Sequence, residues 1–305
     1  MAETLRDKLV ARRFVITAEV TPPVSIDRGE LIAKSLPLKG LADAVNITDA
    51  AGARPHLGAV TSAAILVEQG IEPVLQLTCR DRNRIALQSD LLSAAASGIR
   101  NLLMLRGDDP SAGDQPDAVP VFDLDPRSLL DTARRLRDNG ELPTGRKISG
   151  RADFFLGSAD NPIDPAPGWR PTSLQAKVNA GAQFVQTQFC MDADVVRRYM
   201  TRLAEHRVTD ELYVLIGIVP LRSAKSARWI KEKLFGAVIP DALIARMEQA
   251  KDPLTEGRRI CIDMVRELAD VPSVAGVHIM APGNDVAVPD VIKSARQNIK
   301  RLMPA

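Results

Sequence analysis

The residues best placed for chemistry follow a short apolar run in the first half of the chain. Residues Asn101–Leu105 contain four consecutive apolar side chains, which is typical of a strand buried on both faces of a parallel sheet. Arg106, Gly107 and Asp108 come directly after it. Ligands bind at this edge of parallel α/β sheets, and a glycine there lets the backbone approach a ligand closely. The alternative is a loop that carries a surface ion pair.

A second candidate is the carboxyl group of Glu19, which stands between Ala18 and Val20 in the first apolar strand. A carboxyl group in an apolar setting is costly to ionise unless it is paired. Proteins make general acids for use near neutral pH in this way. The alternative is a structural glutamate that is bonded to a backbone group or to an arginine.

Amides and hydroxyls occupy the ends of other predicted strands. Thr48 ends the second strand, Gln76 lies in the third, and Gln186 and Gln188 share one face of the sixth because side chains alternate along a strand. We expect a glutamine inside a barrel to bond a ligand. Since the sequence pattern indicates neither a Ser–His pair nor a metal cluster, this set favours a bound organic cofactor such as a flavin or a pterin.

The elements that must position these residues are strands that alternate with helices. The predicted strands are 14–20, 44–47, 74–77, 101–105, 154–156, 184–187, 213–218 and 275–280. Such alternation predicts parallel strands joined by right-handed crossovers, and eight of them close into a (β/α)8 TIM barrel of the α/β class. An open doubly wound sheet is the alternative, but no GxGxxG follows the first strand. We interpret residues 1–305 as one domain, with long loops at 108–126 and 157–172 on the ligand-binding face.

Composition narrows the function classes. The 305 residues include 40 Lys plus Arg against 38 Asp plus Glu, and this balance argues against a nucleic-acid partner. Because no apolar stretch has the length of a signal peptide or a membrane span, we expect a cytoplasmic protein without membrane association. Cys79, Cys190 and Cys261 are far apart and are expected to be buried and inert. Three histidines give little support for a metal site.

Several of these segments together resemble the 5,10-methylenetetrahydrofolate reductases. The segments that occur in the family's order are Glu19-x-x-Pro-Pro, Asn46-Ile47-Thr48, Leu77-Thr78-Cys79, Leu105-Arg106-Gly107-Asp108 and Thr187-Gln188-Phe189. The resemblance covers nearly the whole chain and is to the short bacterial catalytic form, without the regulatory domain of animal enzymes. Residues 113–118, 122–125 and 276–280 are similar to a divergent subgroup that includes acetogen-type reductases.

The resemblance implies a barrel that carries FAD. NAD(P)H would reduce the flavin, and methylenetetrahydrofolate would then take the hydride from flavin N5 in a ping-pong reaction, giving 5-methyltetrahydrofolate for methionine synthesis or one-carbon flux. Glu19 would be the general acid that opens the five-membered ring, Asp108 would contact the pterin and the flavin, and Gln188 would hold the pterin ring. The flavin-binding positions also include Thr48, Arg106, Gly107 and Lys177.

The departures from the family pattern fall mainly on the flavin site. Gln76 replaces a histidine, Ala159 lies near the position of a tyrosine, and Arg170 corresponds to an aspartate that contacts the ribityl chain. Ala224 replaces a stacking phenylalanine, and Asn284 replaces a late arginine.

A flavin-independent reductase with direct transfer from NADH is therefore an alternative. Two others are a folate-binding methyltransferase and a subunit that needs a partner protein. NADH and NADPH are not distinguished, and we expect a homo-oligomer.

Overall fold

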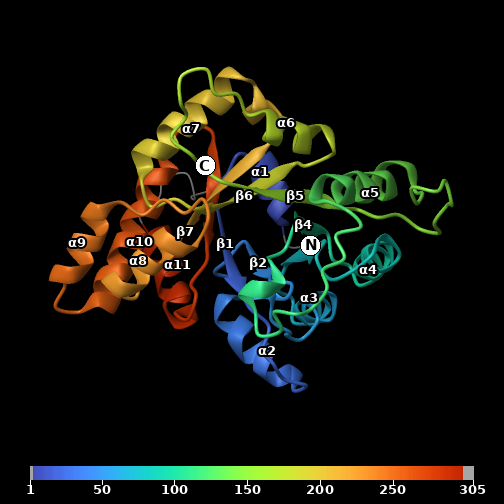
Figure 1. Cartoon of the computed structure of the whole chain (residues 1–305), viewed down its shortest axis with the longest axis horizontal. Coiled ribbons are helices and arrows are strands. Elements are labelled where there is room, and N and C mark those ends of the chain that lie inside the picture. The colour runs from blue at the N-terminus through green and yellow to red at the C-terminus, as the bar shows by residue number, and fades with distance from the viewer. Residues whose placement is uncertain (1–2, 298–305) are drawn as a thin grey trace.

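Eight parallel strands form a closed barrel at the centre of the computed structural model, which describes residues 3–297 (Figure 1). The strands follow one another around the barrel in sequence order, so the predicted (β/α)8 fold is confirmed. Their bounds are β1 Val15–Val20, β2 Ala44–Ile47, β3 Pro73–Thr78, β4 Asn101–Leu105, β5 Phe155–Asp160, β6 Phe184–Phe189, β7 Tyr213–Ile218 and β8 Val274–Ile279.

Helices surround the strands in Figure 1. The α-helices are α1 Leu5–Val10, α2 Arg28–Ser35, α3 Ala59–Glu68, α4 Arg84–Ala96, α5 Pro126–Asn139, α6 Thr172–Asn179, α7 Ala193–Glu205, α8 Ala224–Lys233, α9 Asp241–Gln249, α10 Pro253–Ala269 and α11 Val288–Arg296. The 3-10 helices are η1 Leu36–Leu38, η2 Ala51–Ala53, η3 Pro110–Ala112, η4 Val208–Asp210 and η5 Asp285–Ala287. No helix within residues 3–297 is long and apolar enough to cross a membrane.

Strand β5 differs most from its predicted bounds. It continues to Asp160 through Gly157, Ser158 and Ala159, which carry little apolar signal. A Cβ atom on Gly157 would lie 2.3 Å from Cζ of the Phe184 ring on β6. The small residue therefore makes room for a neighbouring aromatic ring, and the loop after β5 begins at 161 rather than 157. Both ends of the predicted 1–305 domain lie outside the described residues.

The half of the barrel interior nearer the amino-terminal ends of the strands is apolar. Seven strands each contribute one side chain to this layer: Val15, Ala44, Val74, Leu103, Phe155, Phe184 and Leu215. The rings of Phe155 and Phe184 stack with centroids 4.9 Å apart. Leu5 and Leu9 of α1 join the same cluster, so the first helix closes the amino-terminal end of the barrel.

Glu72 holds α1 in this position. Its carboxylate accepts hydrogen bonds from the backbone N–H of Leu5 at 3.0 Å and from Nδ2 of Asn101 at 2.8 Å. Burial disfavours the charged form and raises the pKa of the Glu72 carboxyl group, and the two hydrogen bonds oppose that rise.

The three cysteines are free and buried, as predicted. Burial raises the pKa of Cys79 and of Cys190 to about 12, and it also raises the pKa of Cys261. All three thiols are therefore protonated near neutral pH and are poor nucleophiles.

Candidate functional site

Polar side chains form a second layer above the apolar one, toward the carboxyl ends of the strands. Its members are Thr17 and Glu19 of β1, Asn46 of β2, Gln76 of β3, Gln186 of β6 and His278 of β8. All except Glu19 are buried. The two-residue period of a strand explains the arrangement, because Val15, Ala44, Val74 and Phe184 of the apolar layer each precede one of these residues by two positions.

Glu19 lies at the top of this layer with polar neighbours. Its Oε2 atom accepts a hydrogen bond from Nε2 of Gln76 at 2.9 Å, and Nε2 of His278 lies 3.6 Å from the same oxygen. The expected apolar setting is wrong, because Ala18 and Val20 lie on the opposite face of the strand and pack in the outer core. Within residues 3–297 the other oxygen, Oε1, has no hydrogen-bond partner, and 21% of the side chain is exposed. Glu19 therefore has one oxygen free for a ligand.

The two glutamines of β6 have different surroundings. Gln186 is buried and forms a reciprocal amide pair with Asn46, at 2.6 and 3.0 Å, and its Nε2 donates to Thr17 Oγ1 at 3.1 Å. The expectation that this amide bonds a ligand is wrong, because protein groups already satisfy it. Gln188 is half-buried, and its Oε1 accepts from the backbone N–H of Phe189 at 3.0 Å. Its Nε2 donates to no group in the described part of the chain, so it is available to a ligand.

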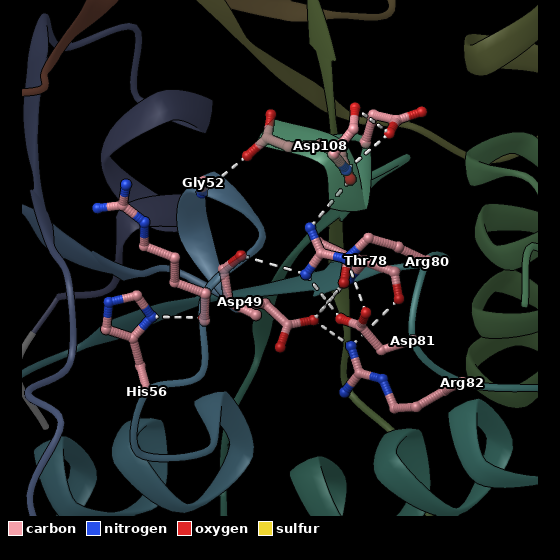
Figure 2. Close-up of polar contacts among 12 residues, drawn as sticks. Asp49, Gly52, His56, Thr78, Arg80, Asp81, Arg82 and Asp108 are labelled. Carbon is pink, nitrogen blue, oxygen red and sulfur yellow. Dashed lines mark hydrogen bonds and ion pairs between the residues drawn. The ribbon is translucent and has the colours of Figure 1, made fainter. Parts of the chain in front are cut away.

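Asp108 is exposed and bonded to the loop after β2. Its Oδ2 accepts from the backbone N–H of Gly52 at 2.8 Å, and Figure 2 shows the two residues facing each other. The buried guanidinium group of Arg80 lies beneath them. It donates to the carbonyl oxygens of Asp108 and Ala50, both at 3.1 Å, and it pairs with Asp81. Arg80 therefore ties together the loops that follow β2, β3 and β4.

The loop after β2 has an unusual backbone. Ala50 and Ala53 have φ angles of 49° and 53°, in the left-handed region that side-chain-bearing residues rarely adopt. A Cβ atom on Gly113, just after η3, would lie 2.0 Å from the carbonyl oxygen of Ala53. The loops after β2 and β4 are therefore in close backbone contact, and the bonds to Asp108 and Arg80 hold this conformation.

Asp49 anchors the ends of β2 and β3 to each other. Its Oδ2 accepts from both the backbone N–H and Oγ1 of Thr78, at 2.7 and 2.9 Å, and it pairs with Arg82 (Figure 2). Arg82 also pairs with Asp90 of α4 at 2.7 Å. These ion pairs stabilise the end of the barrel at the carboxyl ends of the strands, which we call the mouth. No pattern in the sequence indicated their pairing.

The alternative interpretation of this loop, a surface ion pair, is not found between Arg106 and Asp108. The guanidinium carbon of Arg106 lies 4.4 Å from the centre of the Phe122 ring, in a cation–π contact. Gly107, between Arg106 and Asp108 in the sequence, has a φ of 92°. A Cβ atom on this residue would lie 2.9 Å from Cβ of Arg80. Only glycine fits this position without displacing the buried arginine.

Thr48 is buried at the end of β2, and its Oγ1 has no hydrogen-bond partner among the described residues. An unpaired buried hydroxyl costs about 1–3 kcal/mol. This hydroxyl is therefore available to a polar ligand group that enters the mouth.

Lys177 on α6 is held by β5. Its Nζ donates to the carbonyl oxygen of Ala159 at 2.6 Å and lies 3.2 Å from Oδ1 of Asp160. The other oxygen of Asp160 accepts from the hydroxyl group of Tyr199. Burial, together with the charge of Asp160 and the hydrogen bond to it, raises the pKa of Tyr199 well above its usual value. Arg170 is exposed in the loop before α6, apart from this group.

Two residues of the mouth were missed in the sequence. His278 was not assigned to the site, although it lies in the 276–280 segment that is similar to the divergent subgroup, and its signal was a histidine at an inward position of the last strand. Asp285 begins η5 after β8 and lies within electrostatic reach of Glu19 and of Lys34 on α2. Although Asp285 is exposed, partial desolvation of its carboxyl group raises its pKa, with Lys34 opposing the rise and Glu19 adding to it.

A cavity of about 570 Å³ lies on the outside of the barrel between α4, α5 and α6. Its lining includes Arg84, Gln88, Ser128 and Asn179, and none of the predicted site residues contributes to it. We place the candidate site at the barrel mouth because Oε1 of Glu19 and Oγ1 of Thr48, which have no partner within residues 3–297, are there.

The fold and this mouth define the class of protein: a (β/α)8 barrel with an acid, amides and a glycine turn at the carboxyl ends of its strands, where barrel enzymes build their sites. The chain belongs to the methylenetetrahydrofolate reductase family, whose model matches residues 4–296. The predicted resemblance is confirmed.

Individual relatives agree with this assignment. A Caenorhabditis elegans protein, described as a probable methylenetetrahydrofolate reductase (NADPH), is 27% identical over 242 residues, which are 76% of this chain and 34% of the relative. This chain therefore spans about a third of that protein. The 5,10-methylenetetrahydrofolate reductase of Pectobacterium carotovorum is 25% identical over 269 residues, covering 84% of this chain and 82% of the relative.

A solved structure from Clostridium thermocellum has the same fold. It matches with a TM-score of 0.66 at 17% identity and covers 98% of this chain and 100% of its own. It is described as an uncharacterized protein that binds two copies of 5-methyl-5,6,7,8-tetrahydrofolic acid.

Proposed function

We propose that this protein reduces 5,10-methylenetetrahydrofolate to 5-methyltetrahydrofolate with NAD(P)H as electron donor. Family membership supports the reaction. The single observation that carries the proposal is Glu19, whose Oε2 is bonded to Gln76 while Oε1 is unpaired among the described residues. A carboxyl group held in this way can give a proton to a substrate at the barrel mouth.

The reaction needs one hydride and one proton. The methyl group of the product stays on N5, so the bond from the methylene carbon to N10 breaks and its electron pair goes to N10. Glu19 supplies the proton to N10, and the hydride adds to the carbon that remains on N5. Asp108 and Gln188 bind the pterin ring, through a carboxylate acceptor and an amide donor, respectively. The folate bound by the Clostridium thermocellum protein supports a folate ligand.

The residues on one side of the mouth fit a flavin. Thr48 offers a hydroxyl without a partner among the described residues, and the exposed Arg106 lies in the turn after β4, where Gly107 adopts a left-handed backbone. These residues would hold FAD, with Gln76 beside its ring, and FAD when bound would carry hydride between the two substrates. NAD(P)H and the folate would then use one site in turn.

A second candidate is direct transfer from NADH to the folate without a flavin. Its specific support is Lys177, whose ammonium group is already bonded to Ala159 and paired with Asp160. The lysine therefore offers little free charge to a flavin phosphate. Ala159 offers no ring for stacking, and Arg170 is exposed in the loop before α6.

The test is the visible spectrum of the purified protein before and after anaerobic NADH. Flavin bands that bleach with NADH and return with methylenetetrahydrofolate would support the flavin-dependent reaction. A colourless protein that oxidises NADH with methylenetetrahydrofolate would support direct transfer. A colourless protein without activity toward NADH or NADPH would contradict the proposal and favour a folate-binding methyltransferase or a partner-dependent subunit.

A further inference from the structure

The imidazole ring of His278 stands between Glu19 and the buried amides of the polar layer. It is 2% exposed and is enclosed by β1 and β6. Its Nδ1 lies 3.0 Å from Oγ1 of Thr17 and 3.4 Å from Nε2 of Gln186, and its Nε2 lies 3.6 Å from Oε2 of Glu19. Each ring nitrogen therefore faces a different partner.

The partners of Nδ1 decide which ring nitrogen carries the proton. Gln186 Nε2 is a donor only, and its two hydrogens go to Asn46 and Thr17, so its approach to within 3.4 Å of Nδ1 disfavours a further hydrogen on Nδ1. The reciprocal pair ties the orientation of the Gln186 amide to that of Asn46, because exchanging the oxygen and nitrogen of one amide alone would break both bonds of the pair. The hydroxyl group of Thr17 has one hydrogen and two acceptors within reach, Nδ1 of His278 at 3.0 Å and the carbonyl oxygen of Val277 at 3.3 Å, and the shorter contact assigns the hydrogen to Nδ1. The proton of the ring is then on Nε2 and points toward Glu19.

We infer that His278 is a positioning residue for Glu19, and that the buried group Thr17, Asn46 and Gln186 sets its tautomer. This inference rests on the proposed function for the role of Glu19. The Nε2–H of His278 and the amide of Gln76 both point at Oε2, which makes that oxygen an acceptor. The proton that Glu19 delivers is thereby kept on Oε1, the oxygen without a partner in the described part of the chain.

Two substitutions separate positioning from packing. His278→Asn keeps a polar group near the place of Nδ1 but has nothing at the place of Nε2, whereas His278→Gln places an amide donor near Nε2. We expect His278→Asn to lower kcat by about 10- to 100-fold with little change in KM for the folate, because misplaced catalytic groups cost rates of this order. We expect His278→Gln to recover most of that loss. His206→Asn, at an exposed histidine, is the matched control.

The pH profile adds a readout that a packing defect would not move. A reaction that takes a proton from an acid slows as the pH rises, and His278→Asn should displace this limb of the profile while His278→Gln leaves it in place. Asp285 of η5 lies within electrostatic reach of Glu19, and Lys34 of α2 lies within reach of Asp285. Asp285→Asn therefore serves as the control for a purely electrostatic displacement. The inference would be overturned if His278→Asn and His278→Gln lost the same fraction of kcat and if that loss followed their loss of thermal stability.

Nitrogen NMR of the imidazole rings tests the inference without any turnover. The chain has three histidines, so the His278→Asn variant assigns the signal. We expect the proton on Nε2 and a shift of that signal in Glu19→Gln. A proton on Nδ1 would overturn the inference even in an active reductase. A wild-type protein with the expected tautomer but without folate reduction would instead overturn the proposed function alone.

Discussion

The two oxygens of the Glu19 carboxyl group have different surroundings, and this difference leads to a direct test. Glu19→Gln keeps the size of the side chain and an acceptor for Gln76 but removes the acidic proton. We expect kcat for methylenetetrahydrofolate reduction to fall by about 10²- to 10⁴-fold, the usual contribution of a general acid. Initial rates of folate-dependent NADH oxidation measure this. The exposed Glu211→Gln should retain the wild-type rate. If Glu19→Gln kept the wild-type kcat, Glu19 would not be the general acid.

Asp108 allows a second test at the residue scale. Asp108→Asn keeps an oxygen that can accept from Gly52 but loses the charge offered to the pterin. We expect KM for the folate to rise about tenfold, as for a lost hydrogen bond to a charged group, while KM for the nicotinamide substrate stays unchanged. Steady-state kinetics with each substrate varied in turn measure the two constants. The matched control is Asp109→Asn, at a neighbouring side chain that bonds to Ser111. Equal effects on both substrates would contradict a role in folate binding.

At the residue scale the sequence located the strand ends but not the bonds between them. Glu19, Gln76 and Gln186 were singled out because polar residues in apolar strands are conspicuous. Their partners come from strands distant in the chain, as with Asn46 and Gln186, so no local pattern could reveal the pairing. The roles of the predicted site residues remain predictions.

At the element scale, the turn after β4 depends on Gly107. Gly107→Ala should lower the free energy of unfolding for two reasons: the left-handed backbone costs about 1–2 kcal/mol, and contact with the Arg80 side chain adds about 1–3 kcal/mol. Gly140 ends α5 with a φ of 62°, and a Cβ atom added there would meet nothing within 4 Å among the described residues, so Gly140→Ala isolates the backbone cost. Urea unfolding of both variants measures the difference. Equal losses would mean that Arg80 adapts without cost.

The elements themselves were predicted well where apolar side chains define them. Strands β2, β4 and β7 have their predicted bounds because most of their side chains are apolar and buried. Strand β5 extends four residues beyond its predicted end, because a glycine and small residues that fit against the Phe184 ring have no apolar signature. Tertiary packing, and not local propensity, sets that boundary.

At the scale of the whole molecule, the closed end of the barrel gives stability a dependence on pH. The pKa of Glu72 is raised in the folded protein above its ordinary value of 4.5, so the folded state binds more protons than the unfolded state between the two values. The free energy of unfolding therefore falls as the pH rises through this window. Glu72→Gln should lack this fall and gain stability relative to the wild type as the pH rises from about 4.5.

Urea unfolding of both proteins from about pH 4.5 to about pH 8 measures this effect. The exposed Glu211→Gln should follow the wild-type curve throughout. The amide of Glu72→Gln can accept from both Leu5 and Asn101 through its one oxygen, so the helix contact is retained. A stability difference that does not change with pH would contradict the pKa assignment.

The bond between Asp108 and Gly52 has a consequence for affinity. The Gly52 amide is a tethered competitor, present beside Asp108 at a high effective concentration. A ligand that needs Oδ2 of Asp108 binds with its intrinsic constant reduced by the fraction of molecules in which this bond is open. The left-handed backbone at Ala50 and Ala53 is energetically costly, so we expect substitutions that relieve it to change that fraction. We therefore expect changes in this loop to alter KM for the proposed folate substrate without affecting the proposed role of Glu19.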